Sequence, residues 1–179
     1  MVKGGRGALF SSAREVAYVA VMTALLIAAQ YALAAVAGIE LVTALFLPFC
    51  TVFGVRRGCM VATCFSLLRC LLWGFAVNVI ALYLIYYNLF ALVFGLLGRA
   101  LRTLSPPRRL VCTAVAAAFM TACFTLIDDL ISPLILGMRF APYFYASLAV
   151  LAVQPAFAAA SCAVLYLPLE RALRTLRKV

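Results

Sequence analysis

Charged side chains inside apolar stretches are the residues of this sequence best suited to bind something. Arg69 interrupts the apolar run 58–77, Glu40 begins another run, and Asp128 and Asp129 close a third. A charge in an apolar interior needs an opposite charge or hydrogen-bonding partners. Two explanations for Arg69 are open: an internal ion pair with one of these acids, which only holds the fold together, or a charged group on a bound ligand.

Polar and aromatic residues gather near these charges. Tyr83 and Tyr87 are four residues apart and would share one face of a helix. Tyr and Trp are also typical of the interface between lipid and water, a simpler explanation for Trp73, Tyr143 and Tyr145. Residues that should lie deeper fit a pocket better. We therefore predict a substrate-binding pocket made by Glu40, Arg69, Trp73, Asn78, Tyr83, Tyr87, Asn88, Asp128, Asp129, Arg139 and Gln154.

Catalytic and metal chemistry find little support in the sequence. It contains no His, and its seven Cys include no pair at the CxxC spacing of zinc sites. No GxxxxGK[ST] run is present that would bind ATP. Asp128 and Asp129 are neighbours, which point about 100° apart on a helix, so a facing catalytic pair is disfavoured. We expect no catalytic residue, no metal and no cofactor.

The composition indicates what kind of protein positions these residues. Of the 179 residues, 68% are hydrophobic and 11% are charged, and the mean hydropathy is +1.17. A soluble domain carries about 25% charged residues, so this chain cannot present a solvated surface on every side. A helix needs about 20 apolar residues to cross a bilayer. Six runs come close to that length: residues 12–36, 40–54, 58–77, 79–97, 110–127 and 143–167. We predict an all-α integral membrane protein, a single transmembrane domain (1–179) built as a six-helix bundle and surrounded by membrane lipid.

The basic residues predict the orientation of this bundle. The formal charge is +10, which in a soluble protein would suggest nucleic-acid binding. All of the 15 Lys and Arg residues except Arg69 and Arg139 lie before or at the start of the first run, or after the second, fourth and sixth runs. The positive-inside rule puts that side, with both termini, in the cytoplasm, and nucleic acid is not needed to explain the charge. Glu15 and Glu170 lie among these basic residues, where we expect local ion pairs.

The segment 129–142 differs from the rest of the chain. It is too apolar for a solvated loop, yet Pro133 and Gly137 interrupt it. Non-helical backbone within a membrane is tolerated where it is buried or lines a cavity. We therefore predict a lid or re-entrant cap over the pocket.

Small residues recur four apart in the first run, at Ala20, Ala24 and Ala28. This spacing lets two helices approach closely in lipid, either inside the bundle or at a partner's surface. With the size and the predicted topology, it resembles the substrate-binding S component of energy-coupling factor (ECF) vitamin transporters over essentially the whole chain. Ala20-Val-Met-Thr-Ala24 matches the AxxxA contact motif of that family, and residues 38–43 (GIELVT) and 143–169 are similar to stretches in a subgroup of it.

The resemblance implies a multi-pass subunit of the bacterial cytoplasmic membrane that captures a vitamin or related micronutrient from outside and delivers it inward. It also implies two kinds of protein partner: a transmembrane coupling subunit, which would contact Ala20, Ala24 and Ala28, and two ATPase subunits. Between Ala146 and Ala163 the chain has fewer polar residues than that subgroup, so the vitamin stays open. The alternatives are a small membrane scaffold without a ligand, another solute transporter or channel, and an intramembrane enzyme.

Overall fold

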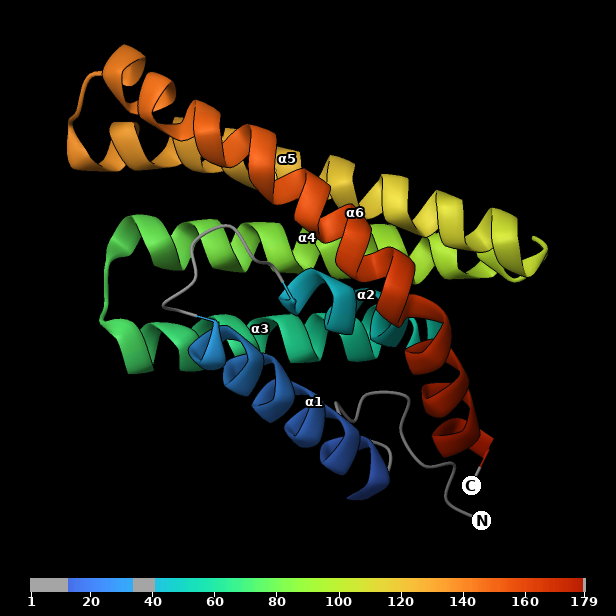
Figure 1. Cartoon of the computed structure of the whole chain (residues 1–179). Helices are drawn as coiled ribbons and strands as arrows, with labels where there is room; N and C mark the ends of the chain where they lie inside the picture. The colour runs from blue at the N-terminus through green and yellow to red at the C-terminus, as the bar shows by residue number, and fades with distance from the viewer. Residues whose placement is uncertain (1–12, 34–40, 179) are drawn as a thin grey trace.

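The computed structural model describes residues 13–33 and 41–178, and within these ranges the chain is helical without any strand (Figure 1). This confirms the all-α prediction and the number of helices. Glu40, one of the predicted site residues, lies outside the described residues. The helices are α1 (Ala13–Ala32), α2 (Val42–Phe53), α3 (Val55–Trp73), α4 (Val77–Leu101), α5 (Pro106–Leu136) and α6 (Phe140–Lys178).

Four of these helices, α1, α4, α5 and α6, are long and apolar enough to cross a membrane, which is compatible with a multi-pass membrane protein. Helix α2 has 12 residues and is therefore about 18 Å long, shorter than the hydrocarbon core of about 30 Å. Helix α3 has 19 residues but carries Arg56, Arg57 and Arg69. The six predicted helices are thus present, and four of them meet the length and composition of a membrane span.

The short helix α2 lies at the centre of the bundle. It contacts each of the other five helices, and of its residues only Leu45 and Phe53 are less than fully buried. The Phe46 ring stacks on Phe90 of α4 with centroids 5.4 Å apart. A helix that is apolar on every side is stable only where other elements surround it, and the five longer helices provide that surrounding here.

Glycine allows α4 to pack closely on the corner that joins α2 to α3. A Cβ atom at Gly98 would lie 2.5 Å from the carbonyl oxygen of Thr51, and one at Gly95 would lie 2.6 Å from the backbone nitrogen of Val55. Both distances are too short for real atoms, so a side chain at either position would push the helices apart. This contact holds α4 against α3, whose polar residues are described below.

The prediction of a lid at 129–142 is wrong. Helix α5 continues through Pro133 to Leu136, and only residues 137–139 separate it from α6. Gly137 ends α5 in the left-handed conformation (φ 65°), and its N–H donates to the carbonyl oxygen of Pro133, a common helix ending. Proline breaks helices in water, but neighbouring groups can compensate for it in a packed membrane helix.

Helix α6 is also longer than predicted. It spans 39 residues, including Pro155 and Pro168, whereas the predicted run covered only residues 143–167. It changes direction in its C-terminal part, where Pro168 lies (Figure 1), since proline removes one helical hydrogen bond and bends the axis. Among the described helices, α6 packs mainly on α5 and α2, and its C-terminal end also accepts a hydrogen bond from Tyr18 of α1. Helices α5 and α6 therefore form a long hairpin that joins the bundle chiefly through α5 and through the C-terminal part of α6.

Candidate functional site

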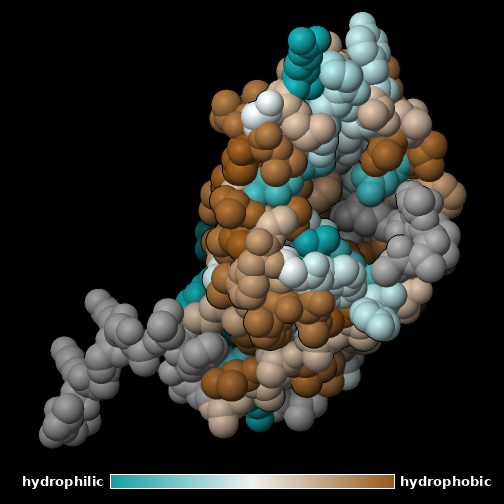
Figure 2. All heavy atoms as spheres, turned by 90° about the vertical axis from the view of Figure 1, so that its left-hand side faces the viewer, coloured by the Kyte–Doolittle hydropathy of each residue, from teal (hydrophilic) through white to brown (hydrophobic). Residues whose placement is uncertain are grey.

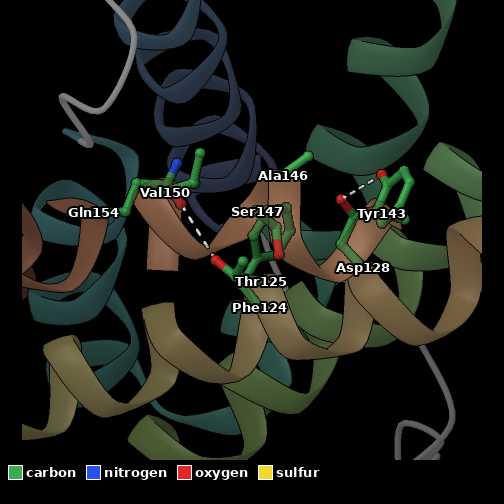
Figure 3. A pocket seen from close by; sticks show the side chains of 8 residues that line it. All are labelled: Phe124, Thr125, Asp128, Tyr143, Ala146, Ser147, Val150 and Gln154. Carbon is green, nitrogen blue, oxygen red and sulfur yellow. Dashed lines mark hydrogen bonds between the residues drawn. The ribbon is translucent and has the colours of Figure 1, made fainter. Parts of the chain in front are cut away.

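A pocket of about 370 Å³ lies between α5 and α6, near the 137–139 turn. We call it the acid pocket, and that end of the molecule the pocket end. Figure 2 views this end and shows polar residues in a hollow among apolar ones. A few polar groups on mainly apolar walls are typical of small-molecule sites. The walls consist of Phe124, Thr125, Asp128, Tyr143, Ala146, Ser147, Val150 and Gln154 (Figure 3).

Helical spacing brings these side chains to facing surfaces. On α5, Thr125 and Asp128 are three residues apart; on α6, Tyr143 and Ser147 are four apart, and Gln154 follows seven residues later. Residues at such spacings share one face of a helix. Thr125 Oγ1 reaches Gln154 Oε1 across the pocket at 3.5 Å. Each helix therefore turns a polar stripe toward the other.

Asp128 is the polar centre of the pocket wall. Its Oδ1 accepts a hydrogen bond from Ser132 Oγ at 2.6 Å. Its Oδ2 accepts one from the Tyr143 hydroxyl at 3.1 Å (Figure 3). Ser132 Oγ in turn accepts from Asn78 Nδ2 at 3.0 Å. This network ties the start of α4 to the hairpin of α5 and α6 and holds the Asp128 carboxylate in position.

Asp129 lies deeper than Asp128, with only 1% of its surface exposed. Ser147 Oγ, on the pocket wall, donates to its Oδ2 at 2.7 Å. Its Oδ1 is buried and has no hydrogen-bond partner in the described part of the chain. A buried polar atom left without a partner costs about 1–3 kcal/mol. The two acids have different partners, as expected for neighbours on a helix.

Arg69 belongs to a second group, which we call the Arg69 cluster: Gln30, Arg69, Trp73 and Tyr83. The Arg69 guanidinium carbon lies 4.5 Å from the ring centroid of Tyr83 and 5.7 Å from that of Trp73. The Tyr83 hydroxyl accepts from Gln30 Nε2 at 2.8 Å. Over residues 13–33 and 41–178, Arg69 forms no ion pair with either aspartate, and its Nε is buried without an acceptor.

The two groups touch through aromatic rings. Tyr83 packs edge-on against Phe124 of the acid pocket, with centroids 5.8 Å apart. Arg69 and the acid pocket are therefore linked by one pair of rings, although their charges do not meet.

The other predicted residues have different surroundings. Tyr87 is buried among the rings of Phe65, Tyr86 and Phe124. Asn88 bridges α3 and α4: its Oδ1 accepts from Thr63 Oγ1 at 3.2 Å, and its Nδ2 donates to the Leu84 carbonyl at 2.9 Å. Arg139 is exposed in the turn between α5 and α6. Tyr87 and Asn88 thus contribute to the core, and the predicted residues that line the acid pocket are Asp128 and Gln154.

Sequence reasoning missed Phe124, Thr125 and Ser147 in the pocket wall and Ser132 behind it, and it assigned Tyr143 to the interface. It ranked residues by charge and by depth in the membrane. The signal that could have found them was the helical face, because Thr125, Asp129 and Ser132 recur at intervals of four and three residues. A polar stripe on a long apolar helix indicates the side that faces the protein interior.

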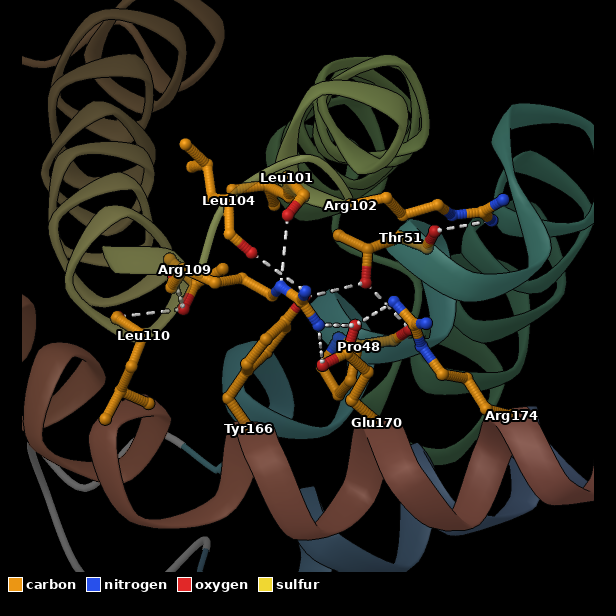
Figure 4. Close-up of polar contacts among 11 residues, drawn as sticks. Pro48, Thr51, Leu101, Arg102, Leu104, Arg109, Leu110, Tyr166, Glu170 and Arg174 are labelled. Carbon is orange, nitrogen blue, oxygen red and sulfur yellow. Dashed lines mark hydrogen bonds and ion pairs between the residues drawn. The ribbon is translucent and has the colours of Figure 1, made fainter. Parts of the chain in front are cut away.

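The opposite end of the bundle, which we call the basic end, holds paired charges. Glu170 on α6 accepts from Arg109 at 3.0 Å and from Arg174 at 2.7 Å (Figure 4). Glu15 on α1 pairs with Arg57 on α3 at 2.6 Å. The local ion pairs predicted for these two acids are confirmed. Arg177 donates to the Val52 carbonyl at 2.8 Å, so the end of α6 also caps the end of α2.

The alanines of α1 lie on an uncovered surface. Ala20, Ala24 and Ala28 are all exposed. The opposite face of the helix, with Val19, Met22, Leu26 and Ala29, is buried in the core. Packing within the bundle therefore does not account for the spacing of the three alanines, and a close-packing face is left available to lipid or to a partner.

Comparison with known protein families, with curated proteins and with solved structures found no significant match to this chain. What the chain binds must therefore be inferred from its own side chains.

Proposed function

We propose that the chain is the membrane-embedded substrate-binding subunit, or S component, of an ECF-type importer. In this role it captures a vitamin or related micronutrient from outside the cell and delivers it inward together with a coupling subunit and two ATPase subunits. The observation that carries the proposal is the acid pocket, a polar site between two long apolar helices at the end of the bundle away from the paired arginines. The proposal assigns no catalytic residue.

The acid pocket suits a small ligand in size and in chemistry. Its volume of about 370 Å³ falls within the range of about 300–1,000 Å³ that is usual for small-molecule sites. Polar groups facing a hollow in an apolar helix pair are costly unless water or a ligand meets them. Asp128, Ser147 and Gln154 are such groups, and a ligand would meet the hydrogen-bonding capacity that their contacts within the fold leave open.

The exposed face of α1 supports a protein partner. Small side chains let a second helix approach closely, and in lipid such packing is a main source of helix association. Ala20, Ala24 and Ala28 supply these small side chains. We therefore assign the coupling-subunit contact to this face of α1.

The charge distribution supports the orientation. Arginines of α3, α5 and α6, together with Arg102 directly after α4, gather at the basic end, which we assign to the cytoplasm by the positive-inside rule. The pocket end then faces the outside of a bacterial cytoplasmic membrane. Six membrane segments belong to this proposal, with the short α2 buried among the other five helices.

Purification of the tagged chain from its native membrane tests this proposal. We expect a transmembrane coupling protein and two ATPase subunits to copurify, and mass spectrometry of the denatured sample to release a small water-soluble molecule. If the chain were a scaffold, other membrane proteins would copurify with it, ATPase subunits would not, and no such molecule would be released. That result would contradict the proposal.

A further inference from the structure

The acid pocket has one carboxylate in its wall and a second behind that wall, and no Lys or Arg among the described residues pairs with either. Asp128 lines the pocket, and Asp129 lies one hydrogen bond behind it, through Ser147. In the part of the chain that the structure describes, every ion pair lies at the basic end, and none involves either aspartate. Arg69 turns toward aromatic rings, and Arg139 is exposed in the turn.

The hydrogen bonds around these acids are those that an ionised carboxylate accepts. Three hydroxyl groups, those of Ser132, Tyr143 and Ser147, donate to them. Within residues 13–33 and 41–178, the buried Asp129 Oδ1 has no donor. An ionised carboxylate accepts at both oxygens, and a charge removed from water requires compensation. A cationic group in the pocket, against Asp128, would supply that compensation.

We propose, on the basis of the function proposed above, that the ligand of the acid pocket is a small organic cation with N–H donors, of the ammonium or amidinium type. Its charged group lies against Asp128, and Asp129 adds negative charge from behind Ser147. An N–H donor on a cation makes a short, strong hydrogen bond to a carboxylate.

The rest of the pocket favours an organic body over a metal ion. Among the described residues there is no group of three or more His, Cys, Asp or Glu side chains that could hold a metal. Phe124, Ala146 and Val150 form apolar walls beside the acid. An aromatic ring also attracts a cation above its face. A compact, flat, partly apolar cation meets both kinds of wall.

Three compounds of one shape and different charge test the proposal: benzamidine, benzamide and benzoate, which are cationic, neutral and anionic. Each is titrated against the purified full-length protein in lipid nanodiscs, and binding is measured by the shift in unfolding temperature and by calorimetry. We expect benzamidine to bind at least about tenfold more tightly than benzamide, and benzoate to bind most weakly. Equal binding of the three, binding led by benzoate, or no binding of benzamidine would overturn the proposal.

Two variants locate the cation. Asp128→Asn and Asp129→Asn should each reduce the preference for benzamidine over benzamide, Asp128→Asn to within about twofold, because the full charge is lost while the shape is kept. Glu15→Gln removes the same charge at the basic end and should keep the preference. A preference that survives both aspartate variants would put the cation elsewhere and overturn the proposal. If one variant does not fold, the other and the three compounds on the unmodified protein decide.

This test is separate from the test of transport. Selective benzamidine binding in a protein that brings down no ATPase would support the cation site and contradict the S-component role. Copurification of ATPases without any preference for benzamidine would support the S-component role and contradict the cation site.

Discussion

At the scale of single residues, Arg69 combines a charge with very few polar partners. Its described contacts are the rings of Tyr83 and Trp73, and its Nε has no acceptor there. A cation–π contact contributes about 0.5–2 kcal/mol, whereas a buried unsatisfied donor costs about 1–3 kcal/mol. These described contacts of Arg69 therefore add little to the stability of the ligand-free fold.

Replacing Arg69 by Met keeps the length of the side chain and removes the charge. We expect the unfolding temperature of the ligand-free Arg69→Met protein to equal or exceed that of the unmodified protein, because an unsatisfied donor disappears. Thermal unfolding in detergent measures it, with Arg139→Met, an exposed position, as the control. A fall of several degrees would contradict this prediction. If Glu40→Gln reproduced the fall, Glu40 would be the partner of Arg69.

At the scale of elements, the position of α4 depends on contacts that only glycine permits. A Cβ at Gly98 would lie 2.5 Å from backbone of α2, whereas one at Gly58 would meet the side-chain atoms of Ala91 and Cys50 at 3.1 Å. Backbone atoms of a packed helix cannot move aside as side-chain atoms can. Gly98→Ala should therefore lower the free energy of unfolding by about 1–3 kcal/mol, the cost of overpacking.

Gly58→Ala is the matched control for Gly98→Ala, since the added methyl group is the same and the contact is looser. We expect a clearly smaller fall in unfolding temperature for Gly58→Ala than for Gly98→Ala. An equal or reversed order would show that α4 does not depend on its approach to Thr51.

Helix α1 carries a prediction of its own, because its alanine face is exposed while the opposite face is buried. A Trp at Ala24 would block close approach of a partner helix without disturbing the core. Ala24→Trp should impair assembly with the coupling subunit and uptake, while ligand binding to the isolated chain is kept. Val115→Trp, at an exposed apolar position on α5, is the control. Normal uptake by the Ala24→Trp protein would reject this surface.

At the scale of the whole molecule, the two ends differ in chemistry. The basic end collects arginines, two of the acids and their ion pairs, and the pocket end holds the two aspartates and the hollow between α5 and α6. In a membrane, such a molecule has one orientation favoured by the positive-inside rule.

Labelling of single cysteines in a Cys-free background measures this orientation. A membrane-impermeant thiol reagent applied to intact cells should label Val77→Cys and Met138→Cys at the pocket end. It should not label Pro106→Cys or Thr175→Cys at the basic end until the membrane is opened. All four positions are exposed, so access to the reagent differs only by side. Labelling of Pro106→Cys in intact cells would invert the orientation.

The sequence alone determined how many helices form and how they are divided by charge. Long apolar runs and clusters of arginine are local properties, and neither depends on how the helices pack. The helix number and the ion pairs of Glu15 and Glu170 are accordingly confirmed. The ends of the helices were harder to predict from the sequence. Proline favours the end of a helix, yet α5 continues past Pro133 and α6 continues past Pro168.

Only the tertiary structure decided which polar residues meet. Arg69 and Asp128 look like partners in the sequence, yet α3 packs on α4 and turns Arg69 onto Tyr83, while α5 turns Asp128 toward α6. The tertiary structure also leaves Ala20, Ala24 and Ala28 of α1 exposed. The physical reason is that helix packing, set by contacts such as Gly98 against Thr51, rotates each helix about its axis. That rotation determines which face of each helix is hidden and which is left for a ligand or a partner.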